Sequence, residues 1–84
     1  MDNCLTIWTN GYRYCTGVSA FRVAETDKAI QFRLLEDENV TFWFPKVALR
    51  HDKNLDGVLN VAPWFKIRDY LAYVWQRYGS VYPR

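Results

Sequence analysis

The sequence predicts an α+β fold, in which an antiparallel β-meander of four to six short strands is covered by one C-terminal α-helix. Three observations predict this arrangement. Apolar and polar residues alternate through residues 28–45, apolar residues recur at helical spacing through residues 64–78, and Asn10-Gly11 separates two strand-like runs. Such a meander either stays open or curls into a small barrel, and the pattern is compatible with both.

Length and composition favour one globular domain spanning residues 1–84. Half of the residues are apolar, 24% are charged and 18% are aromatic, with four Trp, six Tyr and five Phe. A domain of this size buries only about 60–65% of the surface of its unfolded chain, so some rings are expected on the outside. These exposed rings are the first candidates for function.

Charge and hydropathy exclude several classes of protein. A net charge of +2 is too balanced for a protein that grips duplex DNA by bulk charge. The longest apolar stretch, residues 40–45, is far shorter than the roughly 20 residues that span a bilayer. No basic segment of a signal peptide follows Met1. We therefore expect no membrane partner.

Residues 1–17 are predicted to form a β-hairpin. Asn10-Gly11 favours a type I′ turn, because this turn needs positive φ at both central residues. A two-residue turn pairs Ile7 with Tyr14.

The same register separates the two cysteines. Thr6 pairs with Cys15, Cys4 faces Gly17, and the two sulfur atoms point to opposite sides of the ribbon. Free thiols are thus favoured over a disulfide. Free thiols indicate a reducing, cytoplasmic compartment, which is the host cytoplasm if the protein is encoded by a phage.

Residues 18–45 are predicted to continue as a β-meander. A two-residue turn after Glu25 pairs Val23 with Ile30 and Phe21 with Phe32. The inner face is then expected to carry Phe21, Val23, Ile30, Phe32, Leu34, Val40, Phe42 and Phe44. The outer face is expected to carry Arg22, Gln31, Arg33, Thr41 and Trp43.

The region that follows, residues 46–62, is predicted to be a loop with one short strand. Pro45 ends the preceding strand, because proline cannot donate to a ladder. A short helical turn is expected over residues 46–50, and the strand over residues 58–61.

A helix is predicted over residues 63–78, followed by a loosely held tail at residues 79–84. Pro63 suits the first helical position, and Gly79 suits the C-terminal stop. One apolar stripe should cover the inner face of the sheet: Trp64, Ile67, Leu71, Val74, Trp75 and Tyr78.

No catalytic or metal-binding constellation can be assembled. His51 is a candidate general base beside Asp52, but no Cys or Ser can be placed next to it. Residues 52–57 match the first half of an EF-hand loop, but Pro63 stands where the bidentate Glu belongs. Glu36-Asp37-Glu38 is a solvated hairpin tip or an acidic hook for a basic partner. We expect no enzyme activity, no cofactor and no metal.

The predicted helix carries a stripe that resembles an interface. Lys66, Tyr70, Tyr73 and Arg77 recur on the side away from the apolar stripe, and Phe65 also points away from the core. Tyr and Arg are enriched at protein interfaces, so these five residues are the candidate partner-binding site. The alternative is that the first hairpin covers these rings.

The outer sheet face offers a second candidate surface. Arg22, Gln31, Arg33 and Trp43 combine a ring with cations, as in proteins that stack single-stranded nucleic acid. The alternatives are that the sheet curls into a barrel or that Trp43 stacks on an arginine within the monomer.

One stretch carries a resemblance to a known group. The segment Phe42-Trp43-Phe44-Pro45-Lys46-Val47, followed by residues 58–61 and Pro63-Trp64, resembles small β-domains from phages and prokaryotes. In that group a strand ends in a Trp-aliphatic-Pro-Lys-Ser motif, and a second strand leads into a Pro-x-Trp helix start. The resemblance covers about residues 28–71, with Val47 in place of the Ser and no spacer in Pro63-Trp64. It implies a phage or mobile-element accessory protein and no particular activity.

The function expected from these features is that of a non-enzymatic binding module. It would dock onto a host protein or complex as an inhibitor or adaptor. A single-stranded nucleic-acid-binding protein is the alternative. A homodimer is also expected, because a small domain with surplus rings gains by pairing them.

Overall fold

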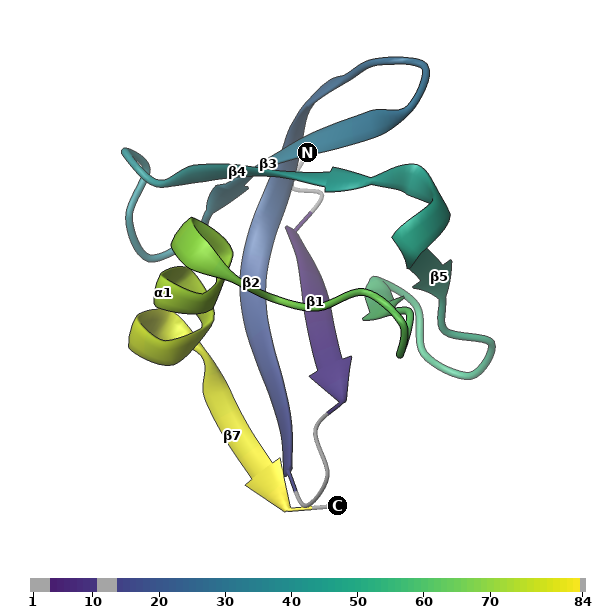
Figure 1. The fold of residues 1–84 in the computed structure, drawn as a ribbon, viewed down its shortest axis with the longest axis vertical. Helices are drawn as coiled ribbons and strands as arrows, with labels where there is room; N and C mark the ends of the chain where they lie inside the picture. The colour runs from purple at the N-terminus through teal and green to yellow at the C-terminus, as the bar shows by residue number, and fades with distance from the viewer. Residues whose placement is uncertain (1–3, 11–13, 84) are drawn as a thin grey trace.

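The described part of the chain, residues 4–10 and 14–83 of a computed structural model, forms a seven-stranded sheet with one α-helix (Figure 1). The strands are β1 (Cys4–Asn10), β2 (Tyr14–Glu25), β3 (Ala29–Leu34), β4 (Thr41–Pro45), β5 (Leu49–His51), β6 (Val58–Val61) and β7 (Ser80–Pro83). The 3-10 turn η1 spans Lys46–Ala48, and the helix α1 spans Asp69–Tyr78. This confirms the α+β class.

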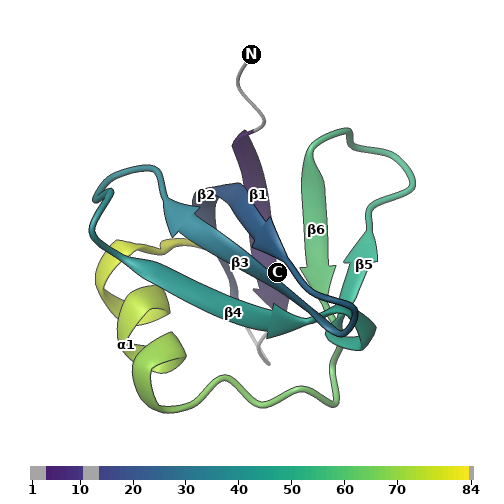
Figure 2. The same cartoon turned by 90° about the horizontal axis from the view of Figure 1, so that it is seen from above.

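The sheet is mixed and has seven strands, which corrects the expectation of an antiparallel meander of four to six strands, and it is the open alternative and not the barrel. Its strand order is β4-β3-β2-β1-β6-β5, with β7 paired to β2. β1 and β6 run parallel, whereas the other pairs are antiparallel. The sheet is therefore not a pure antiparallel meander, and it does not close into a barrel (Figure 2).

The long strand β2 has partners on both edges. β1 pairs along one edge, and the other edge is divided between β7 and β3. Thr16 of β2 pairs with Val81, and Ala20 pairs with Leu34. The expected break between a hairpin and a meander after residue 17 thus lies inside one strand. The expected tail is largely strand β7, because the free edge of β2 offers it a ladder.

The register of β1 against β2 differs from the expected one. Ile7 pairs with Val18 and not with Tyr14. Ile7 and Val18 are buried, so this register places an aliphatic pair in the core. Gly11 and Tyr12, which belong to the expected turn, lie outside the described residues.

The register of β2 against β3 shifts by one residue between Arg22 and Ala24, as at a β-bulge. Arg22 pairs with Phe32, whereas strict alternation predicts Phe21 as the partner. Val23 at the bulge is 47% exposed and not in the core. The bulge therefore moves Arg22 from the expected outer face to the inner side of the sheet.

The pairing of β3 with β4 is as predicted. Phe32 pairs with Phe42, and Ile30 pairs with Phe44. The rings of Phe32 and Phe42 lie 5.9 Å apart, and all three phenylalanines are buried. These strands supply the aromatic part of the core.

The short elements after β4 are also as predicted, apart from one addition. The turn η1 falls within residues 46–50, and β6 matches residues 58–61. Residues 49–51 form strand β5 against β6, which corrects the expectation of a helical turn as far as residue 50 and a loop from residue 51.

Helix α1 begins later than predicted. It starts at Asp69, and Pro63 lies in a turn within the segment that connects β6 to the helix (Figure 2). The Phe65 amide donates a hydrogen bond to the Ala62 carbonyl oxygen at 3.0 Å, so the chain forms a single turn at Pro63 that is not continued as a helix. Trp64 is consequently 58% exposed and does not belong to the core stripe.

The buried face of α1 packs on the phenylalanines of β4. Val74 and Trp75 are buried, and the Trp75 ring lies 5.3 Å from Phe42 and 5.4 Å from Phe44. The helix ends before Gly79, as predicted. The core is formed by Ile7, Val18, Ala20, Phe32, Leu34, Phe42, Phe44, Leu59, Val61, Val74 and Trp75.

Candidate functional site

The helix surface, which we define as Tyr70, Tyr73 and Arg77, lies on the solvent side of α1. Tyr70 is 48% exposed and Tyr73 is 54% exposed, so the first hairpin does not cover them. Their rings stack with centroids 6.4 Å apart and an interplanar angle of 25°. Arg77 follows Tyr73 by one helical turn and is exposed.

The end of the helix surface is held in place by Tyr78. The Arg77 guanidinium lies 5.7 Å from the centre of the Tyr78 ring. The Tyr78 hydroxyl donates a hydrogen bond to Asp37 Oδ2 at 3.2 Å. Asp37 belongs to the predicted acidic tip at residues 36–38. One carboxylate of this tip therefore binds the last residue of α1 and does not remain free for a partner.

The other two predicted partner-binding residues lie before the helix. Lys66 is exposed, but it precedes α1 and is not part of a helical stripe. Phe65 is half-buried against Phe44, with ring centroids 5.5 Å apart, so it does not point away from the core as expected. The exposed ring here is Trp64, which packs edge-to-face with Phe65 at a distance of 6.2 Å between ring centroids.

The outer sheet face keeps three of its four predicted residues. Gln31 pairs with Trp43, which is 45% exposed, and Arg33 lies on the same face. The Arg33 guanidinium sits 5.3 Å from the centre of the Phe21 ring, so its cation faces a ring of its own chain. Arg22 is absent from this face because of the bulge at Val23.

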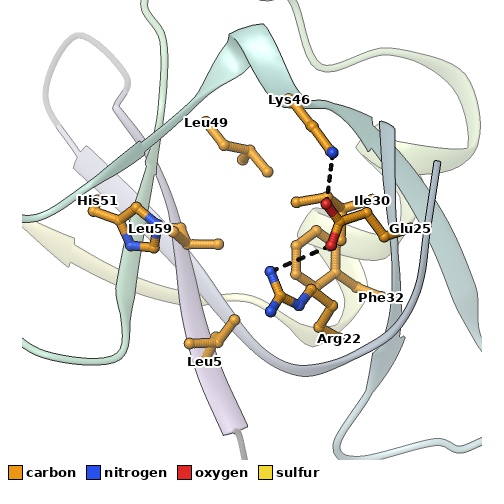
Figure 3. A pocket seen from close by; sticks show the side chains of 9 residues that line it. All are labelled: Leu5, Arg22, Glu25, Ile30, Phe32, Lys46, Leu49, His51 and Leu59. Carbon is orange, nitrogen blue, oxygen red and sulfur yellow. Dashed lines mark ion pairs between the residues drawn. The ribbon is translucent and has the colours of Figure 1, made fainter. Parts of the chain in front are cut away.

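Sequence reasoning missed a pocket on the inner side of the sheet. Its volume is about 280 Å³. Side chains from β1, β5 and β6 on one side, and from β2, β3 and η1 on the other, point into it (Figure 3). The residues lining it are Leu5, Arg22, Glu25, Ile30, Phe32, Lys46, Leu49, His51 and Leu59. No sequence signal marks it, because the bulge and the parallel β1–β6 pair bring these residues together.

Two cations share one carboxylate at the edge of this pocket. Lys46 Nζ lies 2.5 Å from Glu25 Oε2, and the nearest Arg22 nitrogen lies 3.7 Å from Glu25 Oε1. The hydrogen bond and the charge of Lys46, with a smaller effect of Arg22, lower the pKa of Glu25 below its ordinary value of 4.5. Glu25 is thus held as a carboxylate under neutral conditions.

The loop that resembles half an EF-hand uses its first carboxylate for hydrogen bonds. Asp52 Oδ1 accepts from the amides of Asn54 and Leu55, at 2.8 and 3.0 Å, and Oδ2 accepts from Asn60 at 3.1 Å. These hydrogen bonds, led by that of Asn54, lower the pKa of Asp52. No group of three or more metal-ligating side chains occurs in residues 4–10 and 14–83.

The two cysteines lie at opposite ends of the β1–β2 ladder. Cys4 pairs with Phe21, and Cys15 pairs with Asn10, so the expected position of Cys4 opposite Gly17 is wrong. No disulfide joins the two cysteines within the described chain.

The chain matches no family model, no curated protein and no solved structure. No helix among the described residues is long and apolar enough to cross a membrane.

Proposed function

We propose that this chain is a non-enzymatic protein-binding module that docks through the helix surface. The observation that supports the proposal is the exposed, stacked pair Tyr70 and Tyr73 beside Arg77. Val74 and Trp75 anchor the opposite side of the same helix in the core. A partner would therefore meet rings on a rigid support, which lowers the entropy lost on binding.

The chemistry of the helix surface indicates an acidic partner. Tyrosine rings offer large contact area for few rotatable bonds, and Tyr and Arg are typical interface anchors. The cations Lys66 and Arg68 precede α1, Arg77 follows Tyr73 by one turn, and the carboxylate of Asp69 begins the helix. We propose a protein surface with carboxylates around an apolar centre. The phage or mobile-element origin implied by the resemblance would make it a host protein, inhibited or recruited by docking.

The test is affinity capture from a host lysate with a matched pair of variants. Tyr73→Ala combined with Arg77→Glu should abolish capture of a discrete protein, while the thermal midpoint stays nearly unchanged because both side chains are exposed. Trp43→Ala, which removes an exposed ring from the outer sheet face, should capture that protein like the wild type. Unchanged capture by the double variant would refute the proposal.

Two further measurements separate the alternatives. A homodimer that sedimentation detects in the wild type and not in the double variant would make a second copy the partner. Single-stranded nucleic acid is the other alternative, and labelled oligonucleotides should then quench Trp43 and bind more weakly as salt rises. We expect flat titrations, since Arg22 does not lie on the outer face and Arg33 faces Phe21.

A further inference from the structure

We propose that the pocket on the inner side of the sheet binds a small organic anion in which a carboxylate is attached to an apolar body. This site is independent of the helix surface and does not rest on the function proposed above. The carboxylate would meet Arg22 and Lys46 at the rim, and the apolar body would fill the interior.

The interior of the pocket is apolar and preformed. Phe32 and Leu59 are core residues, 0% and 5% exposed, so they hold the floor in a fixed position. The other apolar lining residues are Leu5, Ile30 and Leu49. A volume of about 280 Å³ lies just below the usual range for ligand pockets, about 300–1,000 Å³, and therefore suits only a small molecule.

The rim carries an excess of positive charge. Arg22 and Lys46 are two cations, and Glu25 is the one carboxylate between them. The Arg22–Glu25 separation of 3.7 Å is too long for a hydrogen bond, so the guanidinium can donate to another acceptor. Two cations that share one carboxylate favour the entry of a second carboxylate.

His51 closes the rim on the opposite side. Figure 3 shows its imidazole across the opening from Arg22 and Lys46, with Leu59 beside it. An imidazole N–H is a further donor for an anionic oxygen. His51 is also the single histidine of the chain, so its ring gives one assignable NMR signal at the pocket.

A purely structural role for the charges makes a different prediction. Lys46 and Arg22 could serve only to hold the bulged end of β2 against η1 through Glu25. The pocket would then discriminate ligands by apolar fit alone, and the charge of the head group would not matter. A series of ligands with one apolar body and different head groups separates the two roles.

The test is an NMR titration of the ¹⁵N-labelled chain with octanoate, 1-octanol and octylammonium below their aggregation limits. Octanoate should shift the His51 ring signal and the amides of the lining residues in a saturable way. It should bind about five- to tenfold more tightly than 1-octanol, and octylammonium should bind most weakly. Absence of saturable shifts at the pocket, or equal affinity for octanoate and 1-octanol, would overturn the proposal.

Rim variants test the role of the cations. Lys46→Gln and Arg22→Gln should each weaken octanoate binding about five- to tenfold and leave 1-octanol binding unchanged. Both side chains are partly exposed, so the variants should fold, and the thermal midpoint checks this. Lys53→Gln, in the loop after β5 and outside the lining, is the matched control. If neither rim variant weakens octanoate binding, the assignment of the anion site is wrong.

Discussion

The Gly79 amide donates a hydrogen bond to the carbonyl oxygen of Trp75 at 3.0 Å, and a Cβ atom on Gly79 would overlap that same oxygen. The Cβ would also overlap the methyl group of Thr16 in β2. Gly79 has φ of −73°, so it is not needed for a left-handed conformation. Its role is to let the end of α1 approach β2 closely.

Gly79→Ala should therefore destabilise the fold. Overpacking at such a contact costs about 1–3 kcal/mol, because the backbone of α1 or β2 must move to make room. Urea denaturation followed by circular dichroism measures the loss. Ser80→Ala, at the next and exposed position, is the control, and equal midpoints for the two variants would contradict the close approach.

The two tryptophans of the predicted helical stripe should respond differently to truncation. Trp75→Ala removes a ring that packs on Phe42 and Phe44, and should cost about 3–5 kcal/mol of unfolding free energy. Trp64→Ala removes a side chain that is 58% exposed, and should change stability by less than about 1 kcal/mol. A loss of similar size for both would place Trp64 in the core after all.

The bulge at Val23 predicts an asymmetric response in β2. Val23→Thr should be nearly neutral, since Val23 is 47% exposed. Val18→Thr buries a hydroxyl at a position that is 2% exposed, and should cost about 1–3 kcal/mol. Thermal unfolding of the two variants compares the positions directly. A loss of similar size for Val23→Thr would place Val23 in the core and contradict the bulge.

The Glu25–Lys46 contact predicts a specific pH dependence. The pKa of Glu25 is lower in the folded chain than its ordinary value of 4.5, so the contact contributes stability above that pH. This contribution is lost as the pH falls through the lowered pKa. NMR titration of the Glu25 carboxyl carbon should show the low value, and Lys46→Gln should raise it. An unchanged Glu25 titration in Lys46→Gln would contradict this cause, and Lys53→Gln is the control.

Local pattern predicted the parts of the fold that depend on local pairing. The β3–β4 register follows from alternation on both strands, which brings Phe32 to Phe42 across a short loop. The end of α1 is predicted at the right place by the glycine at position 79, although Gly79 has φ of −73° and does not adopt the left-handed conformation of a glycine cap. Both predictions depend on residues that are close together in the sequence, and a single sequence is enough to recognise such local patterns.

The parts that sequence reasoning missed depend on long-range pairing. No turn motif connects the parallel strands β1 and β6, so no local signal predicts that they pair. Strand β7 forms because it can hydrogen-bond to the otherwise unpaired edge of β2. The bulge breaks the period of two without a Gly or Pro to mark it, so Arg22 was placed on the wrong face. For that reason sequence reasoning missed the pocket. Tyr70 and Tyr73 are exposed, which agrees with the interface alternative and not with cover by the first hairpin.

The divided edge of β2 implies that the two halves of this strand form at different times. The half that pairs with β3 closes over a short loop, which is a fast event, whereas the half that pairs with β7 must wait for a segment far along the chain. Val81 and Tyr82 of β7 are exposed, whereas Phe32 and Leu34 of β3 are buried, so native-state hydrogen exchange should detect opening of the β2–β7 ladder at lower free energy than opening of the β2–β3 ladder. α1 connects to β7 through Gly79, so detachment of this strand would also release the end of the helix that carries Arg77.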